Sequence, residues 1–430
     1  MTRMEGCPQT EKILCGHTTI SRGLCVKDIA ECNIRSNGPR PIPVIPENEV
    51  GKKYAYVEEF LGQHCFYPHN KLKVDYEAVY EGRGELIPDV FTFLTYNIWG
   101  LAQSKNHQHL FNLRKNLLEE TLRAAKADIL CLQEMSVYAY KQLEPFILKY
   151  KFASEIPYPA SSSKRNREVD TYIISNYHPE RIVVYGLPGV LGYEDSVTIV
   201  EYPNLVIFNL YNQAGSKHSP GQQHKWIHYS RCRYDILESI YLLILKKYSH
   251  QNIILCGDFN FDLDGSIEEW PEIEMMNSLK RIGFIDSYRS VHPDNPGYTE
   301  DTDKNFMRFN QKLIEKRYRY DAVLYRLAPP GPIASWGIRA AELVGTDMEC
   351  LDAEESDWFI QNMSEAKGGR EHLLRRCTKD GHLPIFPSDH FGVLTHFQRN
   401  KQIAGRRRRT RMNKRKTKRN FTQKRCSHCK

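Results

Sequence analysis

Short apolar segments of the chain end repeatedly in side chains that suit metal or phosphate chemistry. Asn97 follows FTFLTY, Glu134 follows DILCLQ, and Asp389 precedes FGVLTHF. A carboxylate at the end of a strand suits a hard cation, because Mg²⁺ takes one or two protein carboxylates together with water and phosphate oxygens. A single such residue can equally be an ordinary surface acid, so the expectation depends on several of them occurring in order.

The strongest local motif is GDFN, which follows the apolar segment NIILC. Asp258 and Asn260 are two residues apart, so in an extended backbone their side chains point the same way, and Gly257 leaves room for close approach. An acid beside an amide can orient a water for in-line attack on phosphorus and donate to the phosphate. The alternative is an Asp and an Asn that merely begin a loop.

A second pair of chemical groups, Asp389 and His390, precedes the last apolar segment in PSDHFGVL. Upstream, Asp321 is an acid inside the apolar segment RYDAVLYR. A buried Asp needs a partner, and an imidazole is suitable because the carboxylate fixes its tautomer and stabilises its charged form. We therefore infer an Asp321–His390 pair. A structural ion pair between Asp321 and Arg319 is the competing interpretation.

From residue 91 onward, short apolar segments alternate with amphipathic helical patterns, which is typical of mixed α/β layering. The periodicity predicts helices at 109–127, 225–248 and 273–282, and a polar loop or insertion at 344–387. Strands are predicted in FTFLTYN, DILCLQ, TYIIS, RIVVYG, SVTIVEY, LVIFNLY, NIILCGDFN, RYDAVLYR, residues 335–343 and GVLTHF.

Composition divides the chain into an N-terminal extension (1–88), a catalytic domain (89–398) and a basic tail (399–430). The chain has 60 Lys and Arg and 52 Asp and Glu; 15 of the basic residues and none of the acidic ones lie in the tail, so the remainder has 45 basic and 52 acidic residues, formally −7. This asymmetry indicates a nucleic-acid-binding arm or a nuclear-import signal. A merely solvated tail is the alternative.

No segment approaches the ~20 apolar residues of a membrane-spanning helix, and the start MTRMEGCPQTEK lacks the apolar block of a secretory signal. We expect an intracellular protein of the nucleus or cytoplasm. Reduced thiols fit this expectation, because cysteines such as Cys131 and Cys256 lie in apolar segments. The terminal CSHC, with Cys426 and Cys429, is half a zinc site at best, and chance is the preferred interpretation.

Six motifs, TYNIWG, LQE, NLYNQAG, GDFN, RYDAVLY and SDH, occur in the order and approximate spacing of the endonuclease/exonuclease/phosphatase superfamily. The resemblance covers residues 91–397. That superfamily includes pancreatic deoxyribonuclease, apurinic endonucleases, deadenylases, inositol polyphosphate phosphatases, neutral sphingomyelinases and the second type of tyrosyl-DNA phosphodiesterase. The resemblance implies a four-layered α/β sandwich, with two packed mixed β-sheets flanked by helices, and a phosphodiesterase that depends on Mg²⁺ or Mn²⁺.

The resemblance also implies roles for individual residues. The residues that would hold the metal are Asn97, Glu134 and Asp389. The groups that would align the water and the phosphate are Asp258 and Asn260. His390, oriented by Asp321, would act on the phosphate or on its attacking water, so hydrolysis needs no covalent intermediate.

One departure concerns the central strand, where many members of the superfamily have a Thr-His-Leu motif. This chain has NLYNQAG and places Tyr211 there. Apurinic endonucleases have a tyrosine followed by a similar AG turn, and a phenol can donate to a phosphate oxygen. We therefore count Tyr211 among the catalytic residues.

The substrate is less determined than the chemistry. HPDNPGYTEDTDKN and FPSDHFGVL resemble the sphingomyelinase and tyrosyl-DNA phosphodiesterase branches. We favour nucleic acid, DNA or RNA, since the tail GRRRRTRMNKRKTKR would neutralise phosphates, with Trp99, Arg308 and Phe309 as substrate contacts. The alternatives are a phospholipid or phosphoinositide hydrolase and an inactive nucleic-acid-binding protein.

Overall fold

The computed structural model describes residues 76–399 except 101–103, 155–169, 189–193, 216–225, 309–314, 329–335 and 365–367. Before residue 76 it describes only the backbone of two hairpins, β1 (Lys12–Cys15) with β2 (Thr18–Ser21) and β3 (Tyr54–Glu59) with β4 (Gln63–Pro68). Most of the predicted N-terminal extension, Phe309, and the basic tail from residue 400, including CSHC, lie outside the described residues.

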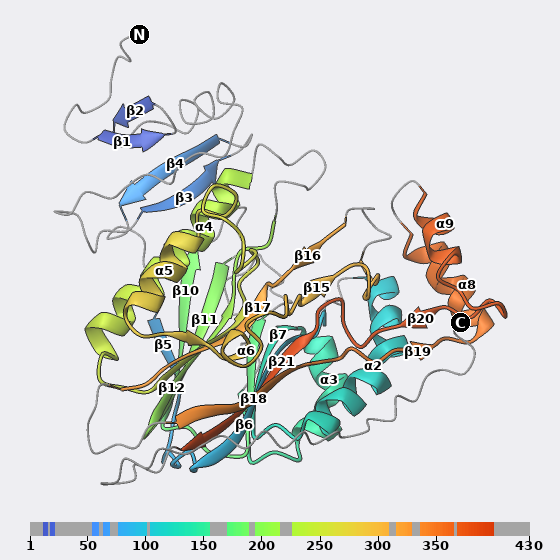
Figure 1. The fold of residues 1–430 in the computed structure, drawn as a ribbon, viewed down its shortest axis with the longest axis horizontal. Coiled ribbons are helices and arrows are strands. Elements are labelled where there is room, and N and C mark those ends of the chain that lie inside the picture. The colour runs from blue at the N-terminus through green and yellow to red at the C-terminus, as the bar shows by residue number, and fades with distance from the viewer. Residues whose placement is uncertain are drawn as a thin grey trace.

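Two mixed β-sheets form the centre of the molecule (Figure 1). The six-stranded sheet has the order β18 (Trp336–Val344), β21 (Gly392–Arg399), β6 (Val90–Asn97), β7 (Ile129–Met135), β9 (Asp170–Ser175) and β8 (Phe152–Ala153). The seven-stranded sheet has the order β14 (Ile285–Asp286), β17 (Asp321–Arg326), β13 (Ile253–Asp258), β12 (Leu205–Tyr211), β11 (Glu194–Tyr202), β10 (Arg181–Pro188) and β5 (Tyr76–Glu81). Strand β5 lies within the predicted extension, yet it pairs with β10.

Each sheet contains one central parallel pair, β6 with β7 and β12 with β13, and its other pairs are antiparallel. Alternating side chains bury both faces of these strands, because successive residues of a strand point to opposite sides. In β6, for example, Phe93 packs in the core between the sheets and Leu94 packs under the outer helices. Between the sheets, Gln133 Nε2 also donates to Asn209 Oδ1 at 2.7 Å, which links β7 to β12.

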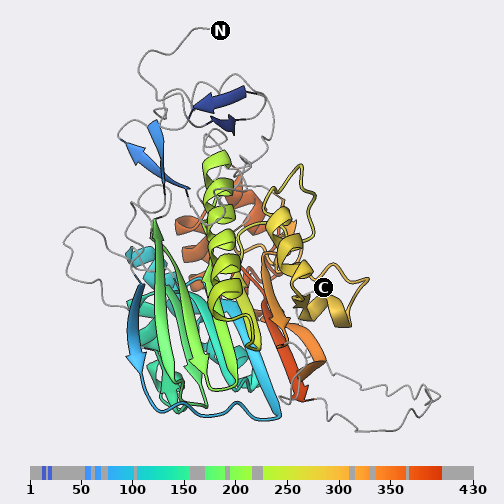
Figure 2. The same cartoon turned by 90° about the vertical axis from the view of Figure 1, so that its left-hand side faces the viewer.

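Helices cover the outer face of each sheet (Figures 1 and 2). The six-stranded sheet is covered by α2 (Lys105–Ala125) and α3 (Val137–Ile147), and the seven-stranded sheet by α4 (Trp226–Lys247) and α5 (Ile273–Arg281). The layers therefore follow the order helix, sheet, sheet, helix, which confirms the predicted four-layered sandwich. In this described part of the chain, no helix is both long and apolar enough to cross a membrane.

The helix boundaries follow from local capping. Helix α2 begins after Ser104, whose side chain accepts a hydrogen bond from the His107 backbone, and it ends at Lys126 in the left-handed conformation. The sequence placed this helix at 109–127, so its start was predicted four residues late. The shift has a simple cause: polar residues form the first turn, and the apolar pattern begins only at Leu110.

The segment 344–387, predicted as a loop or insertion, contains regular structure. It forms α8 (Ala353–Asn362), α9 (Gly369–Leu374) and the small pair β19 (Glu349–Cys350) with β20 (Pro384–Ile385). Scattered apolar residues of this segment join one cluster with Trp99 and Phe306, including Phe359 and Leu383. Its few apolar residues are too widely spaced for the periodicity to predict helices, but they suffice to cover this end of the sandwich. Three short elements complete the fold: α6 (Ser287–Val291) and the pair β15 (Glu300–Asp301) with β16 (Arg317–Tyr318).

Gly257 is required by the close approach of β13 to β12. Its φ is +129°, and a Cβ atom built there would lie 1.8 Å from the Leu210 carbonyl oxygen. An L side chain is thus excluded by both backbone conformation and contact. Gly381 has a similar φ of +81° but nothing within 4 Å of its Cβ position.

We predict that Gly257→Ala destabilises the protein far more than Gly381→Ala. The second substitution adds only backbone strain, about 1 kcal/mol, whereas the first also forces two strands apart and costs roughly 3 kcal/mol or more. Chemical denaturation of both variants measures the difference in the free energy of unfolding. Equal losses would show that β12 and β13 are not packed as described.

Arg319, two residues before the start of β17, is held by ion pairs with two acids. Its side chain is 4% exposed, and it forms ion pairs with Asp264 at 2.9 Å and Asp286 at 2.5 Å. Asp264 is also paired with Arg289. Burial raises the pKa of Asp264, but the hydrogen bonds from Arg319 and Arg289 outweigh it and lower the pKa to about 2.

The Asp264 pairs should stabilise the fold in a defined pH window. Because the folded pKa is below the ordinary value of 3.8, the stabilisation is complete above about pH 4 and is lost as the pH falls toward 2. Asp264→Asn should therefore cost on the order of 1 kcal/mol at neutral pH, after allowance for solvent screening, and give a shallower loss of melting temperature between pH 4 and 2. Exposed Asp294→Asn is the control. Parallel pH profiles for the Asp264 variant and the unmodified protein would contradict these pairings.

Candidate active site

The predicted functional residues meet at one end of the central strands of the two sheets, which we call the site edge. Asn97, Glu134, Tyr211 and Asp258 lie at or near the carboxyl ends of β6, β7, β12 and β13, the two parallel pairs. Strand β17 runs antiparallel to β13, and its first residue, Asp321, is in register with Asp258. Strand topology within each sheet and the packing of the two sheets therefore bring these five residues to one place.

Asp389 and His390 reach the same edge from the other side of the six-stranded sheet. They precede β21, which is antiparallel to β6 and pairs Val393 with Thr95. Ser388 fixes this entry, because its Oγ donates to the Asn97 carbonyl oxygen at 2.7 Å. No local pattern in the sequence predicts this contact of Ser388, because its two positions are 291 residues apart.

The Asn97 amide bridges two buried acids. Its Nδ2 donates to Asp258 Oδ2 at 2.9 Å and to Glu134 Oε1 at 3.2 Å, while its Oδ1 accepts from the Trp99 backbone N–H at 3.0 Å. A neutral donor between two carboxylates reduces their mutual repulsion. Asn97 thus orients both acids in this structure.

Two of the strand ends are held by left-handed backbone. Glu134 and Asn260 both have φ +56°, which is uncommon for residues other than glycine. At Glu134 this conformation coincides with a register shift between β7 and β9, and Asn260 follows the end of β13. Such strained positions concentrate at functional sites.

Asp258 is fixed by three donors. Besides the Asn97 amide, the Asn260 backbone N–H donates to Oδ1 at 2.8 Å and the Asn260 Nδ2 to Oδ2 at 3.3 Å. Asn260 Nδ2 also donates to the Asn212 carbonyl oxygen at 2.8 Å. The side chains of Asp258 and Asn260 are adjacent, although not through the extended backbone assumed from the sequence, because β13 ends at Asp258 and Asn260 is left-handed. Asn260 orients the acid.

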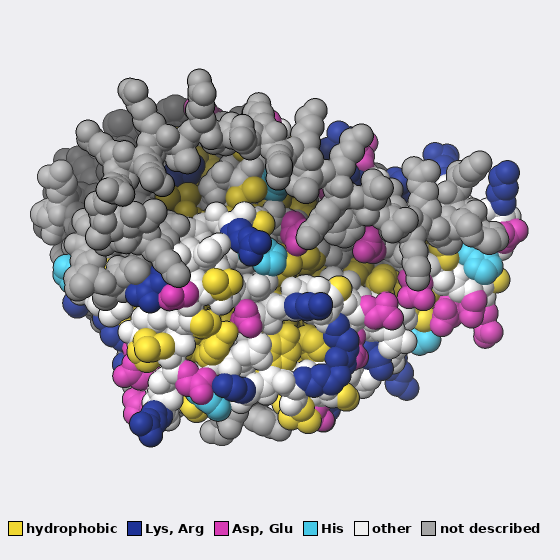
Figure 3. Space-filling model, turned by 60° about the horizontal axis from the view of Figure 1, so that its bottom comes forward, with side chains coloured by type: hydrophobic (Ala, Val, Ile, Leu, Met, Phe, Trp, Pro, Cys, Tyr) yellow, Lys and Arg dark blue, Asp and Glu magenta, His cyan; other side chains and the backbone are white. Residues whose placement is uncertain are grey.

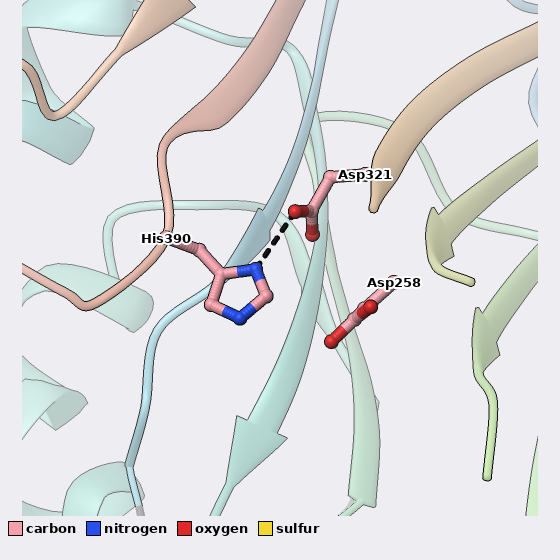
Figure 4. A group of neighbouring side chains, drawn as sticks. All are labelled: Asp258, Asp321 and His390. Atoms are coloured by element: carbon pink, nitrogen blue, oxygen red, sulfur yellow. Dashed lines mark hydrogen bonds and ion pairs between the residues drawn. The ribbon is translucent and has the colours of Figure 1, made fainter. Parts of the chain in front are cut away.

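His390 forms the pair inferred from the sequence. Its Nδ1 lies 2.8 Å from Asp321 Oδ2, and both side chains are buried (Figure 4). Arg319 forms its ion pairs with Asp264 and Asp286 instead. Because the Nδ1 side of the His390 ring bonds Asp321, the Nε2 side of the imidazole remains available to a reacting group.

The side chains of Asp258, Asp321 and His390 point toward one another from separate elements (Figure 4). One ligand atom of each lies within 4.8 Å of the others, and all three residues are buried. Burial and the charge of Asp321 raise the pKa of Asp258 to about 8. Burial alone would lower the pKa of His390, but the charges of Asp321 and Asp258 outweigh it and raise the pKa well above its usual value. A charged imidazole thus lies beside an acid that takes up a proton readily.

Tyr211 and Glu134 form a second hydrogen-bonded pair in the site, and the pKa of each is raised. The Tyr211 hydroxyl donates to Glu134 Oε1 at 2.8 Å, and burial together with the Glu134 charge raises the phenol pKa well above 10. Burial and the charge of Asp389 raise the pKa of Glu134. The phenol therefore stays protonated and remains a hydrogen-bond donor.

Arg308 is the partly exposed cation of the site. Its guanidinium lies 3.4 Å from Asp389 Oδ2 and 5.8 Å from the centre of the Trp99 ring, and its side chain is 38% exposed. Burial alone would lower its pKa, but Asp389 and Glu134 raise it above the ordinary value. Trp99 itself is only 3% exposed, so its ring packs against Arg308 from the protein interior. Of these two side chains, Arg308 is therefore the one that faces solvent.

The acids of this site fit a divalent cation. Among the described residues, Glu134 Oε2 is buried and has no hydrogen-bond partner. The charge of Asp389 acts on this same carboxylate. An orphaned buried carboxylate oxygen near a second acid is costly unless a cation compensates it. Glu134 and Asp389 would hold such an ion. In this structure the nitrogen of the Asn97 amide faces the acids and its oxygen accepts from Trp99, so Asn97 would orient the ligands instead of binding the ion.

A buried ion pair supports the loop that follows β12. Arg233 Nε donates to Glu272 Oε1 at 2.6 Å, and both side chains are 0% exposed. Arg233 Nη1 donates to the carbonyl oxygens of Gln213 at 3.1 Å and Gly215 at 2.8 Å. This pair was not predicted from the sequence, because a basic and an acidic residue 39 positions apart give no local pattern.

Comparison with solved structures found similar chains at low sequence identity. Truncated TDP2 from Caenorhabditis elegans is 15% identical, with 72% of this chain and 98% of that chain covered and a TM-score of 0.46. A mannosyl-6-phosphatase from Bacteroides thetaiotaomicron is 16% identical (71% and 99% covered, TM-score 0.46), and a 3'-5' exonuclease from Neisseria meningitidis is 19% identical (71% and 99% covered, TM-score 0.43).

No curated protein sequence matches the chain. The family model described as the Endonuclease/Exonuclease/phosphatase family matches residues 94–308, half of the chain, from within β6 to Arg308. This segment contains the NIWG, LQE, NLYNQAG and GDFN motifs. The chain therefore belongs to the endonuclease/exonuclease/phosphatase family, whose members are hydrolases that act on phosphoester bonds.

Proposed function

We propose that this protein is a metal-dependent phosphodiesterase that hydrolyses phosphodiester bonds of nucleic acid, DNA or RNA, by in-line attack of a water. The observation that carries the proposal is the buried group of Asp258, Asp321 and His390, which lies beside the acids that fit a cation. An acid that accepts a proton and an imidazolium that donates one are the two groups that such a hydrolysis requires.

The proposed reaction uses the chain's own groups as follows. Asp258, held by Asn97 and Asn260, orients the attacking water and accepts its proton. His390, kept charged by Asp321, donates from Nε2 to a phosphate oxygen as negative charge develops there. Water attacks directly, and no covalent intermediate forms on the enzyme.

Tyr211 and Arg308 supply the remaining contacts to the phosphate. The Tyr211 phenol donates to Glu134 in this structure, and we propose that it turns to donate to a non-bridging oxygen when the phosphate binds. The guanidinium of Arg308, which is the outward-facing cation, binds the phosphate electrostatically. A Mg²⁺ or Mn²⁺ ion held by Glu134 and Asp389 would stabilise charge on the phosphate and its leaving oxygen when bound.

A nucleic-acid substrate is supported by the distribution of charge along the chain. Basic, acidic and apolar side chains are interspersed over the described part of the face in Figure 3. The tail, by contrast, has 15 Lys and Arg and no acid. We propose that this segment binds phosphates outside the site and holds the polymer near it, without regard to sequence.

Removing either partner of the proposed proton transfer should abolish turnover. Asp258→Asn and His390→Gln are each expected to lower kcat at least about 10³-fold, because a positioned group is lost from phosphoryl chemistry. EDTA should do the same to the unmodified protein, with recovery on addition of Mg²⁺ or Mn²⁺. Steady-state rates on a single-stranded oligonucleotide, a duplex with a blocked end, sphingomyelin and a phosphoinositide would identify the substrate.

Asp128→Asn is the matched control for these substitutions. Asp128 precedes β7 at the opposite edge of the sheets, where it accepts hydrogen bonds from Thr92 and Asn176. Its loss removes an equivalent carboxylate from the fold but not from the site, so kcat of the folded protein should be unchanged. Turnover of the lipids but not of the oligonucleotides would refute the nucleic-acid assignment while leaving the chemistry intact.

Truncation after residue 400 should separate binding from chemistry. Arg399 is the last residue of β21 and pairs with Asp89, so the cut spares the sheet. We expect weaker oligonucleotide binding with a flatter dependence on salt, because fewer phosphates are neutralised, and unchanged turnover of a small phosphodiester. Fluorescence anisotropy at several salt concentrations measures this. An unchanged salt slope would assign the tail to localisation alone.

A further inference from the structure

Arg114 is a buried cation that none of the proposed chemistry uses. It lies in α2, and its residue is 1% exposed. In the described part of the chain, all acceptors of its hydrogen bonds are backbone carbonyl oxygens: Ile98 at 2.9 Å, Trp99 and Pro387. A guanidinium buried without a hydrogen-bonded carboxylate is unusual, because burying a charge is costly unless many polar contacts compensate it.

The three carbonyls belong to two loops that carry site residues. Ile98 and Trp99 directly follow Asn97 at the end of β6, and Pro387 lies two residues before Asp389 and three before His390. One planar guanidinium therefore spans the backbone of both loops, since its fork of N–H groups points in fixed directions. The loops are almost three hundred residues apart in sequence, and Arg114 joins them directly.

The surroundings of Arg114 keep it rigid and charged. Its guanidinium lies 5.1 Å from the centre of the Trp99 ring and 5.0 Å from that of Phe111. Burial lowers its pKa to about 10, while the nearby charges of Asp389 and Glu134 oppose that shift. It therefore remains a cation at neutral pH, and it places a fixed positive charge behind the acids of the site.

We propose that Arg114 is a positioning residue that sets the distance between the Asn97–Glu134 end of the site and the Asp389–His390 end. This inference rests on the proposed function for its catalytic consequence but not for its structural one. Misplacing reacting groups by about 1 Å can cost on the order of 10²-fold in rate. Loss of the Arg114 contacts should accordingly lower kcat much more than it changes KM.

A second buried arginine provides the matched control. Arg326 is 6% exposed, and its Nη2 donates to the carbonyl oxygens of Tyr248 at 2.7 Å and Ser249 at 3.1 Å, with Gln251 at 3.5 Å. It performs the same kind of loop bracing with similar burial. However, it lies at the end of β17 remote from Asp321, so it contacts no loop of the site. A purely structural role for Arg114 would make the two arginines equivalent.

The test compares Arg114→Met with Arg326→Met, using the full chain. We expect similar losses of melting temperature in both variants. Arg114→Met should lower kcat about 10- to 100-fold with KM within about threefold of the unmodified protein, and Arg326→Met should leave both unchanged. Arg114→Lys keeps the charge, but its single ammonium lacks the fork that spans both loops. We expect it to restore stability more fully than kcat.

Hydrogen exchange gives a readout that does not depend on turnover. Arg114→Met should speed exchange of the Ile98 and Trp99 amides and of the Phe391 amide together, whereas Arg326→Met should affect the Gln251 amide instead. In the structure these amides are hydrogen-bonded to Gln133, Asn97, Thr299 and Tyr248, respectively. If Arg114→Met does not fold, Arg114→Lys carries both measurements.

The outcomes separate this inference from the proposed function. Faster exchange in both loops of Arg114→Met, without any turnover by the unmodified protein, would support the positioning role of Arg114 and refute the proposed function. Faster exchange in only one loop, or an equal fall of kcat in the Arg326 and Arg114 variants, would overturn this positioning role. A Lys variant with fully restored kcat would also overturn it, since charge alone would then suffice.

Discussion

Concentrated negative charge at one edge of the two sheets is the constraint on which the site depends. Glu134, Asp258, Asp321 and Asp389 are all at most 5% exposed. Carboxylates withdrawn from water repel one another and lose hydration, so they persist only where donors and cations face them. The protein supplies the Asn97 amide, the Tyr211 hydroxyl, the imidazole of His390 and the guanidinium of Arg308, and still leaves Glu134 Oε2 without a partner among the described residues.

The architecture holds this charge in place through two parallel strand pairs and rigid loop supports. Because β6 runs parallel to β7 and β12 to β13, four carboxyl ends lie on one side of the sandwich, and the left-handed residues Glu134 and Asn260 lie at or near two of these ends. Behind the edge, Arg233 holds the loop after β12 by its carbonyls. The layers thus position acids and imidazole before any ligand arrives, which is what electrostatic catalysis of phosphoryl transfer requires.

The α/β layers and the functional residues at strand ends could be predicted from the sequence, because both produce local sequence patterns. Short apolar segments marked the strands, and the polar residues at their ends marked the site groups. The adjacency of Asp258 and Asn260 was expected from an extended backbone, whereas in the structure it depends on the left-handed Asn260. Sequence reasoning did not predict contacts that depend on tertiary structure, such as the Asn97 amide between two acids or the buried Arg233–Glu272 pair. It also missed α8 and α9, whose widely spaced apolar residues are explained only by the surface that they cover. Roles for Phe309 and the basic tail stay predictions.

Cation binding tests the central claim most directly, because the described site has more buried carboxylates than its own donors and cations compensate. Titration calorimetry of Mg²⁺ into the unmodified protein and into Glu134→Gln, at one pH and ionic strength, measures it without any substrate. The account predicts saturable binding by the unmodified protein and at least about tenfold weaker binding by the variant, since the orphaned carboxylate is a principal ligand. Binding of equal strength in both, or no binding by the unmodified protein, would contradict it.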